Sequence, residues 1–318
     1  MTAAVEARGV AKQYGSLVAV EDLTFSVDAG EVLGVLGPNG AGKTTAIRVL
    51  TTILAPTRGT FTVAGMPHTR PAEIRRRVGV LPESAGYPDR QTGEEYLRYH
   101  ARLFGQSRAS ARELAHKLLE EVGLAERARS LISAYSRGMR QRLGIARALV
   151  NDPEVVFLDE PTLGLDPAGQ RQILGNVRAI ASERGAAVLL CSHLLAEVEE
   201  NCSRVMILNR GHVVAEGTVA EIVSRAAAPR SGRFQVAPEH AERAALALSA
   251  AGSVDGVERL NGRPGWLTVV FPASGEKTAD ASLNDAVRAL LDSGVELRSF
   301  ELEGARLSDA FLAMTEAV

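Results

Sequence analysis

One short segment constrains the fold of this chain more than any other. Residues 37–45 match the pattern Gly-x-x-x-x-Gly-Lys-Ser/Thr and follow an apolar run, 32–36, that is typical of a buried strand. A helix is expected from Lys43. The glycines let the backbone curl, so that its N–H groups converge on an anion at the start of the helix. The pattern predicts a phosphate-binding loop in an α/β fold.

Two side chains of this loop are suited to a nucleotide. Lys43 brings a mobile ammonium to β- and γ-phosphate oxygens, and the Thr44 hydroxyl is placed to ligate a Mg²⁺ that bridges them. The alternative is a plain glycine-rich turn, which the flanking strand and helix disfavour. The predicted nucleotide-binding residues of the loop are Gly37, Pro38, Asn39, Gly40, Ala41, Gly42, Lys43, Thr44 and Thr45.

A second apolar strand, 155–158, ends in two acids, Asp159 and Glu160. Ligands of open α/β sheets bind at such carboxyl ends. Asp159 is placed to hold Mg²⁺, directly or through water, and Glu160 to orient or deprotonate a water that attacks the γ-phosphorus. Two acids after a strand are more often a helix cap or a solvated loop. The upstream phosphate loop reverses that preference.

Length and composition further limit the domain organisation and the kinds of partner that the sequence allows. A chain of 318 residues with 46% hydrophobic content is long enough for a large core and one smaller module. The net charge is −2, from 36 basic and 38 acidic residues, so no general cationic surface is expected and no nucleic-acid partner. The two cysteines, Cys191 and Cys202, lack metal-site spacing and are expected to act as small apolar side chains in a reducing compartment.

The sequence gives no indication of export or of membrane insertion. Its N-terminus carries an early acid and no apolar stretch of signal-peptide length. The longest apolar runs, such as 186–191, are far shorter than the ~20 residues that cross a bilayer. We therefore expect a cytoplasmic protein, with any membrane span supplied by another chain.

Short β-rich runs occupy the chain up to about residue 82, and from residue 155 to 215 strands and helices alternate, which predicts a mostly parallel sheet with helices on its faces. A helical middle part is expected over 84–150, with helices that begin after the caps Thr92 and Ser110. The acids Glu197, Glu199 and Glu200 are expected on a solvated helix face. The other expected strands are 17–27, 59–64, 78–81, 187–191, 205–208 and 212–215, and the other helices 43–53, 167–182 and 194–201.

A small polar segment with proline and glycine interrupts this pattern near residue 229 and predicts a linker. The expected domains are 1–226, a linker at 227–231, and 232–318. After the linker the order strand, helix, strand, strand, helix, strand predicts a ferredoxin-like α+β domain. A last helix places Leu307, Ala310, Phe311 and Met314 on one face, which packs inward or onto a partner.

Three further segments carry a family resemblance. They are Tyr135-Ser136-Arg137-Gly138-Met139-Arg140-Gln141-Arg142-Leu143, then Glu160-Pro161-Thr162-Leu163-Gly164-Leu165-Asp166, then Leu190-Cys191-Ser192-His193. Together with the phosphate loop, the chain from about residue 5 to 220 resembles an ATP-binding cassette (ABC) ATPase. The resemblance implies a P-loop NTPase core: a RecA-like, mostly parallel sheet with an antiparallel β subdomain and a helical subdomain, next to the small C-terminal α+β domain.

The resemblance also implies roles for single residues. Catalytic roles fall to Glu160 and to His193, the γ-phosphate sensor; Mg²⁺ ligands to Thr44, Glu83 and Asp159. Beyond the loop, ATP-binding roles fall to Tyr14, which would stack on adenine, to the signature residues Ser136 and Gly138, and to Asp166 of the D-loop. An aromatic near an N-terminal strand is about as often part of the core. The implied cofactors are ATP and Mg²⁺.

Several positions depart from the family pattern. Tyr135, Arg137 and Met139 differ from the usual signature Leu-Ser-Gly-Gly-Gln, and Arg137 adds charge beside the phosphate-contacting pair. Glu83 replaces a glutamine, and Leu163 replaces a small polar residue before the D-loop aspartate. These changes bear on turnover and coupling rather than on nucleotide binding.

The signature segment, Glu83 and the C-terminal module resemble the drug-resistance-type branch of bacterial exporter ATPases. This implies ATP hydrolysis that powers efflux of a drug-like or other substrate, a homodimer of cassettes, and a separately encoded integral membrane permease at the cytoplasmic face of the membrane. Two alternatives stay open: a cassette ATPase that acts on ribosomes or DNA, and a nucleotide-binding regulator. The C-terminal domain could stabilise the dimer, regulate it, or serve only in packing.

Overall fold

The computed structural model describes residues 3–84, 86–225, 231–260, 262–271, 279–303 and 306–316. The chain divides into two compact units, Met1–Val219 and Ala220–Val318. Helix α8 (Val219–Arg225) thus lies at the start of the second unit, ahead of the predicted linker. Most of that linker, 227–230, lies outside the described residues, so its place stays a prediction.

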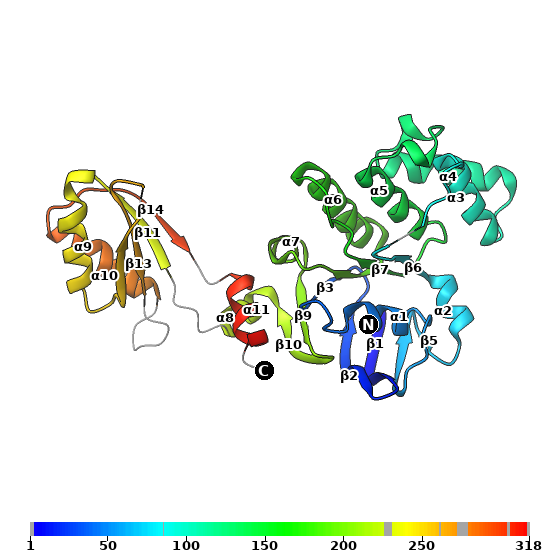
Figure 1. Ribbon diagram of the computed structural model, residues 1–318, viewed down its shortest axis with the longest axis horizontal. Coiled ribbons are helices and arrows are strands. Elements are labelled where there is room, and N and C mark those ends of the chain that lie inside the picture. Colours follow the sequence, from blue (N-terminus) through cyan, green and yellow to red (C-terminus); the bar gives the residue numbers. More distant parts are fainter. Residues whose placement is uncertain are drawn as a thin grey trace. The chain divides into compact units, whose positions relative to one another are not determined.

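A six-stranded sheet forms the centre of the first unit (Figure 1). Its order is β10-β9-β3-β8-β7-β6, and only the pair β9–β10 is antiparallel. β3, β7 and β8 are buried along their whole length, because other elements cover both faces, and this explains their continuous apolar sequences. The strands are β3 (Val32–Leu36), β6 (Val78–Leu81), β7 (Val155–Asp159), β8 (Ala187–Cys191), β9 (Arg204–Asn209) and β10 (His212–Thr218).

A second, antiparallel sheet has the order β2-β1-β4-β5. Helix α1 (Lys43–Leu50) contacts β1 and β2 of this sheet and β7 of the other, so it lies between the two sheets. One apolar core joins all three, with Phe25, Ile47 and Leu33 among its members. The strands are β1 (Val5–Tyr14), β2 (Leu17–Val27), β4 (Arg58–Val63) and β5 (Met66–Pro67); β1 was not foreseen.

Helices cover the opposite face of the six-stranded sheet, where Figure 1 shows α5, α6 and α7. α3 and α4 pack on each other and on α5, which confirms the predicted helical part. None of the described helices has the length and apolar character that a bilayer span requires. The helices are α2 (Pro71–Arg77), α3 (Gly93–Leu103), α4 (Arg108–Glu121), α5 (Arg137–Ala148), α6 (Pro167–Arg184) and α7 (Leu195–Asn201).

One predicted helix cap is correct and one is wrong. Thr92 caps α3 in a capping box with Glu95, as its sequence suggests. α4 begins three residues earlier than expected, because Ser107 is the cap and accepts a hydrogen bond from the Ser110 backbone N–H at 3.1 Å. Both serines are suitable caps. In the structure the helix starts at Arg108, so Ser107 occupies the cap position and Ser110 lies in the first turn.

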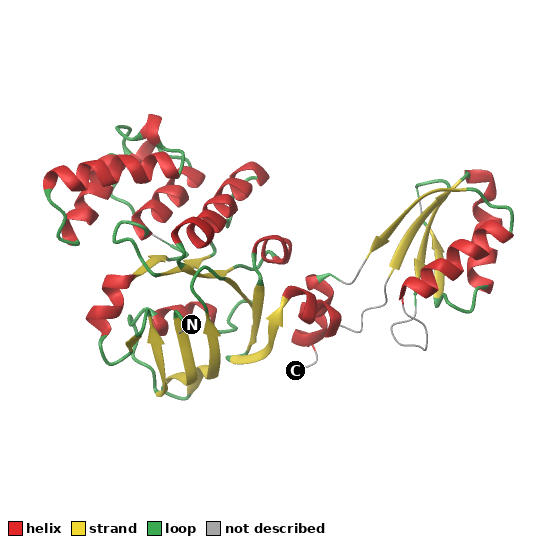
Figure 2. Ribbon diagram, turned by 180° about the vertical axis from the view of Figure 1, so that it is seen from behind, coloured by secondary structure: helices red, strands yellow, loops and turns green. Residues whose placement is uncertain are grey.

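The second unit has the predicted ferredoxin-like topology. Its sheet order, β12-β13-β11-β14, is antiparallel throughout and splits each strand–helix–strand unit around a third strand. Figure 2 shows both helices on one face of this sheet, and Phe234, Leu248 and Leu290 belong to the core between them. The elements are β11 (Ser231–Val236), α9 (Ala241–Ala250), β12 (Gly256–Arg259), β13 (Trp266–Val270), α10 (Ala279–Asp292) and β14 (Leu297–Glu303).

The terminal helix α11 (Leu307–Glu316) buries the face that its spacing predicts, with Leu307 and Ala310 fully inaccessible to solvent. Cys191 and Cys202 are free thiols, and both are buried as small apolar side chains. Burial raises the pKa of both thiols, to about 12 for Cys202, which keeps them protonated and unreactive at neutral pH.

Candidate functional site

The phosphate-binding loop runs from the end of β3 to the start of α1. Gly40 and Gly42 have φ angles of 82° and 106°, in the left-handed region that glycine favours. A Cβ at Gly37 would collide with the Leu208 carbonyl, and one at Gly42 with the Ala19 carbonyl. The lack of a side chain at these glycines therefore lets the loop pack closely against the backbone of both sheets.

Helix α1 begins without a side-chain cap. Gly42 occupies the cap position, and the first turn contains no acid. The helices α3, α4, α5 and α6, in contrast, are each capped by a side-chain oxygen. The first N–H groups of α1 and its positive dipole end are therefore available to an anion bound in the loop.

The Lys43 ammonium lies within the loop itself. Its Nζ donates to the Gly37 carbonyl at 2.5 Å and to the Pro38 carbonyl at 3.3 Å, and the residue is 8% exposed. A buried ammonium requires acceptors. The backbone carbonyls supply them here, and phosphate oxygens in the same loop could replace them.

A hollow of about 440 Å³ opens over the loop. This size suits a nucleotide-sized ligand. Besides the loop residues 38–45, it is lined by four residues from the first β-hairpin and three acids: Tyr14, Leu17, Val18, Ala19, Glu83, Asp159 and Glu160. The structure thus places apolar hairpin side chains at one side of the phosphate loop and carboxylates at the other.

Tyr14 ends strand β1 and is 43% exposed, so it is not a core residue. The Lys12 ammonium lies 5.2 Å from the centroid of its ring, a cation–π contact. Leu17, at 66% exposure, lines the hollow beside it. These exposed apolar groups form a surface on which a flat base could stack.

Asp159 ends strand β7 as a buried carboxyl, 2% exposed, and accepts a hydrogen bond from Thr44. Burial raises its pKa, and the neighbouring carboxylates of Glu83 and Glu160 raise it further, against the lowering effects of Thr44 and Lys43. Its Oδ1 is buried without a hydrogen-bond partner. Such a carboxylate oxygen, next to a threonine hydroxyl, fits a hard divalent cation.

No cluster of three or more His, Cys, Asp or Glu side chains that could hold a metal occurs within the described ranges. Mg²⁺ is usually bound by one or two protein groups together with phosphate oxygens and water. The predicted ligand Glu83 is exposed but lines the same hollow.

Glu160 and His193 lie in contact. His193 Nδ1 is 2.6 Å from Glu160 Oε2. Glu160 has a φ of 52°, and its backbone N–H donates to the Cys191 carbonyl at 2.9 Å. Left-handed backbone is uncommon for a non-glycine residue and is concentrated at functional sites. The ends of the neighbouring strands β7 and β8 thus bring these two predicted residues together.

The signature residues and the D-loop aspartate lie outside this hollow. Ser136 caps α5 by accepting from the Met139 N–H at 3.3 Å, and Asp166 caps α6 by accepting from the Gly169 N–H at 3.1 Å. The Arg137 guanidinium lies directly against Gly164 of the D-loop. The structure therefore pairs Arg137 with the D-loop of its own chain.

One acid was misjudged from the sequence. Glu197, predicted on a solvated face, is 8% exposed and accepts hydrogen bonds from Thr162 at 2.7 Å and Ser192 at 3.3 Å. Burial is the main cause that raises its pKa. The run Glu197, Glu199, Glu200 looks uniform in sequence, but the contact of α7 with α6 and β3 turns only the first acid inward.

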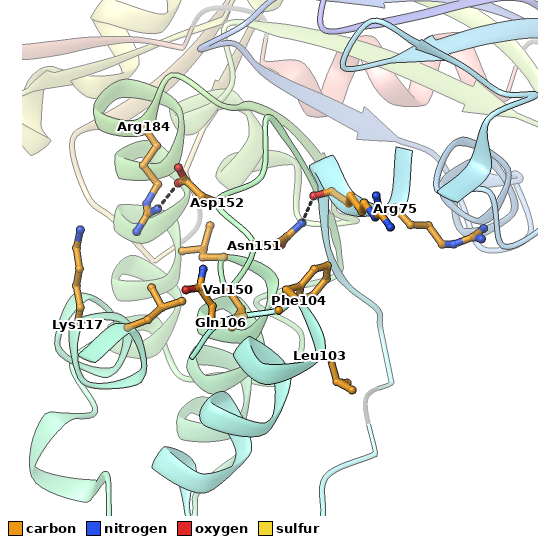
Figure 3. A pocket seen from close by; sticks show the side chains of 13 residues that line it. Arg75, Leu103, Phe104, Gln106, Lys117, Val150, Asn151, Asp152 and Arg184 are labelled. Atoms are coloured by element: carbon orange, nitrogen blue, oxygen red, sulfur yellow. Dashed lines mark hydrogen bonds and ion pairs between the residues drawn. The ribbon is translucent and has the colours of Figure 1, made fainter. Parts of the chain in front are cut away.

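A second hollow, of about 810 Å³, lies where the helical subdomain meets the end of α6 (Figure 3). Arg184 there pairs with Asp152 at 3.0 Å and with Glu121 at 2.6 Å. Its lining shares no residue with the phosphate loop, although it is the larger hollow, so we do not assign it to the nucleotide. It is lined by Arg75, Arg76, Leu103, Phe104, Gly105, Gln106, Leu114, Lys117, Leu149, Val150, Asn151, Asp152 and Arg184.

Fold and site together define a P-loop nucleotide-binding protein: a glycine-rich loop after β3, and an acid-bearing strand β7 separated from β3 by β8. The family model described as ABC transporter matches residues 20–163. The daunorubicin/doxorubicin resistance ATP-binding protein DrrA of Streptomyces peucetius is 38% identical over 322 residues, 99% of this chain and 93% of that protein. Nod factor export ATP-binding protein I of Paraburkholderia xenovorans is 42% identical over 223 residues, 70% of this chain and 73% of that protein.

Solved structures agree. An ATP-binding subunit of an ABC transporter is 34% identical, with a TM-score of 0.64 over 70% of this chain and 93% of that one. A dimeric ATP-binding cassette with ADP and phosphate, 24% identical, matches with a TM-score of 0.62 over 67% of this chain and 98% of that one. The chain belongs to the ABC transporter family. It is the ATP-binding, ATP-hydrolysing subunit of such a transporter. The predicted fold class and the resemblance to exporter ATPases are confirmed, and the ribosome- or DNA-associated alternative is disfavoured.

Proposed function

We propose that this ATPase powers the efflux of a drug-like compound through a separate membrane permease. The observation that carries the ATPase part of this proposal is the arrangement of the site: an uncapped helix, a buried lysine and a buried carboxylate meet in one hollow. Support for the efflux role comes from relatives named for daunorubicin and doxorubicin resistance and for Nod factor export. A nucleotide-binding regulator would not need the Glu160–His193 contact.

Each residue of the hollow has a chemical role in this proposal. The backbone N–H groups of 39–45 and the Lys43 ammonium hold the β- and γ-phosphates. Thr44 and Asp159, whose Oδ1 is unpartnered, would hold Mg²⁺ together with Glu83. Bound there, Mg²⁺ would neutralise phosphate charge. Tyr14 stacks on the base.

Glu160 and His193 act at the γ-phosphate. The Glu160 carboxylate orients the attacking water and accepts its proton, while His193 holds that carboxylate through Nδ1 at 2.6 Å. The left-handed backbone at Glu160 aims the side chain toward the hollow that it lines. Water activation thus depends on a side chain positioned by two strand ends.

A second copy of the chain completes the site. Ser136, Gly138 and Asp166 do not line the hollow of their own chain, whereas ATP-binding cassettes are known as dimers. We place the Ser136 and Gly138 end of α5 against the γ-phosphate held by the partner copy, where the helix N-terminus favours an anion. ATP binding closes the dimer, and hydrolysis reopens it.

We further propose that the permease binds at the second hollow and that the subunit thereby works at the cytoplasmic face of the membrane. Exposed apolar side chains, among them Leu103 at 64% and Phe104 at 44%, lie beside the cations Arg75, Arg76 and Lys117. An apolar patch rimmed by charge is typical of protein interaction sites. It fits a permease segment that combines an aromatic or aliphatic anchor with acidic groups.

The ATPase proposal is tested by phosphate release from the purified full chain, with and without a co-expressed permease. Glu160→Gln is expected to reduce turnover at least about 100-fold while ATP still binds, and Lys43→Ala to weaken ATP binding. Full turnover in Glu160→Gln would show that Glu160 does not activate the attacking water. Undiminished ATP binding in Lys43→Ala would refute the site itself.

The permease proposal has its own test. The double variant Arg75→Glu/Arg76→Glu is expected to lose co-purification with the permease from membranes and to keep its basal ATP hydrolysis. Arg8→Glu, on an exposed residue of β1, serves as the control for a change of surface charge. Undiminished co-purification of the double variant would move the docking site elsewhere.

The C-terminal unit is proposed to stabilise the cassette dimer. It has a core of its own, built around Phe234 and Leu267. Truncation from residue 231 should then weaken ATP-dependent dimerisation, measured by sedimentation, without reducing ATP binding. ATP-dependent dimerisation of the truncated chain at the unmodified level would contradict a dimer-stabilising role for this unit.

A further inference from the structure

Helix α7 carries a buried carboxyl that joins two segments of the candidate site. Glu197 Oε2 accepts hydrogen bonds from the Thr162 hydroxyl at 2.7 Å and from the Ser192 hydroxyl at 3.3 Å. Thr162 and Ser192 are fully buried, and Glu197 is 8% exposed. Hydrogen bonds to an ionised acceptor are stronger than neutral ones and gain strength away from water. A single oxygen on α7 thus fixes the segments that follow two neighbouring strands, β7 and β8.

Both hydroxyls stand beside the proposed catalytic pair. Thr162 lies two residues after Glu160, and Ser192 directly precedes His193. Ser192 also accepts a hydrogen bond from the Leu194 N–H at 3.0 Å, which orders the chain just after His193. The left-handed backbone at Glu160 persists only where surrounding contacts hold it. The Glu197 contacts are placed on both sides of the pair and can supply that restraint.

We infer that Glu197 is a positioning residue for ATP hydrolysis. Its carboxylate holds the segments after β7 and β8 at the separation that brings Glu160 into contact with His193. The inference rests on the catalytic roles proposed above for these two residues. Glu197 itself does not line the nucleotide hollow, so its replacement is expected to leave ATP binding unchanged. Turnover depends on Glu197, because a displacement of about 1 Å at a reacting group can cost about 100-fold in rate.

Two substitutions separate the hydrogen bonds of Glu197 from its volume. Glu197→Gln keeps a carbonyl oxygen that can accept from both hydroxyls, and it puts an amide where Oε1 now lies buried without a partner. Glu197→Leu fills similar space and accepts nothing. Glu200→Gln, on an exposed acid of the same helix, is the matched control.

The experiment measures steady-state ATP hydrolysis and binding of a fluorescent ATP analogue by the full chain. Glu197→Leu is expected to lower kcat at least about tenfold, with analogue affinity changed less than about twofold. Glu197→Gln should restore most of the turnover, and Glu200→Gln should equal the unmodified chain. Thr162→Val removes one donor at constant volume and should lower kcat by a smaller factor, which provides a second variant if Glu197→Leu does not fold.

Each contrary outcome is distinct. Turnover of Glu197→Leu or of Thr162→Val at the unmodified rate, with Glu160→Gln inactive, would overturn the positioning role and leave the proposed function intact. Parallel loss of analogue binding and turnover in a folded Glu197→Leu chain would show a structural role and overturn the inference as well. Full activity of Glu160→Gln would overturn the proposed catalytic roles, and the inference with them.

Discussion

His193 Nδ1 lies 2.6 Å from Glu160 Oε2, in a hydrogen bond that joins the ends of two neighbouring strands. A carboxylate can only accept, so His193 must carry its proton on Nδ1 in this contact. Nε2 is then an acceptor in the neutral ring. It can donate to a γ-phosphate only if the ring is a cation or has turned away from Glu160.

Replacement of His193 by alanine should therefore slow hydrolysis more than it weakens ATP binding. We expect kcat to fall about 100-fold, because both the restraint on Glu160 and the phosphate contact are lost. His212→Ala is a suitable control, since His212 also faces a glutamate, Glu21, at 3.4 Å, and Glu21 does not line the hollow, whereas Glu160 does. Equal loss of affinity and turnover in His193→Ala would argue for a binding role only.

Gly164 and Gly175 should respond to alanine in opposite directions. Gly164 has a φ of 72° and the Arg137 guanidinium directly against it, so Gly164→Ala is expected to cost about 1–2 kcal/mol from the backbone alone and to displace the D-loop. Gly175, inside α6 with open space around it, should gain about 1 kcal/mol. Thermal melting of both variants checks this. A double variant with Arg137→Ala should recover part of the loss at Gly164, and no recovery would mean that the contact with Arg137 is unimportant.

Tyr87 connects the loop after Glu83 to the signature helix. Its hydroxyl donates to the Arg140 carbonyl at 2.9 Å, and its ring meets Tyr96 edge-on. Tyr87→Phe should lower stability by about 0.5–1.5 kcal/mol, since one partly buried hydrogen bond is lost. Tyr99→Phe, at a ring that is 56% exposed, should leave the melting temperature unchanged. Equal melting of the two variants would contradict a stabilising role for the Tyr87 hydroxyl.

Glu197 also predicts how stability depends on pH. Burial raises its pKa above 4.5, as does Glu160, while Thr162, Ser192 and His193 lower it. A folded state with a raised carboxyl pKa binds more protons than the unfolded chain, so its stability falls as pH rises from 4.5 through the folded-state pKa. Glu197→Gln should consequently melt higher than the unmodified chain at pH 8, with the gain shrinking toward pH 5. A gain that grows on acidification would contradict the sign.

Much of this arrangement could be predicted from sequence because it rests on local chemistry. The loop from Gly37 to Thr45, the acids after β7 and the strand order of the second unit each follow from short patterns of residue types. These patterns act over a few residues, where backbone geometry leaves few alternatives. The confirmed elements are mostly of this kind.

The errors arose where long-range packing decides. Glu197 and Glu200 look alike in sequence, and only the contact of α7 with its neighbours buries the first. Strand β1 was missed because Gly9, with a φ of 60°, and several register shifts interrupt its alternating pattern. The spacing of Ser107 and Ser110 permits either cap. The buried Thr162 and Ser192, which could have indicated Glu197, are recognisable only once the strands are assembled.

The bare N-terminus of α1 has a consequence for stability. Elsewhere in the described helical subdomain, side chains such as Thr92 and Ser107 satisfy the first amides of a helix from within the chain. At Gly42 no side chain does so, and the nucleotide itself becomes the missing cap. The first turn of the helix on which the hollow is built is thereby completed by the substrate. Amide exchange at Lys43 to Thr45 should then slow when ATP binds, because the bound phosphates would order the first turn of α1.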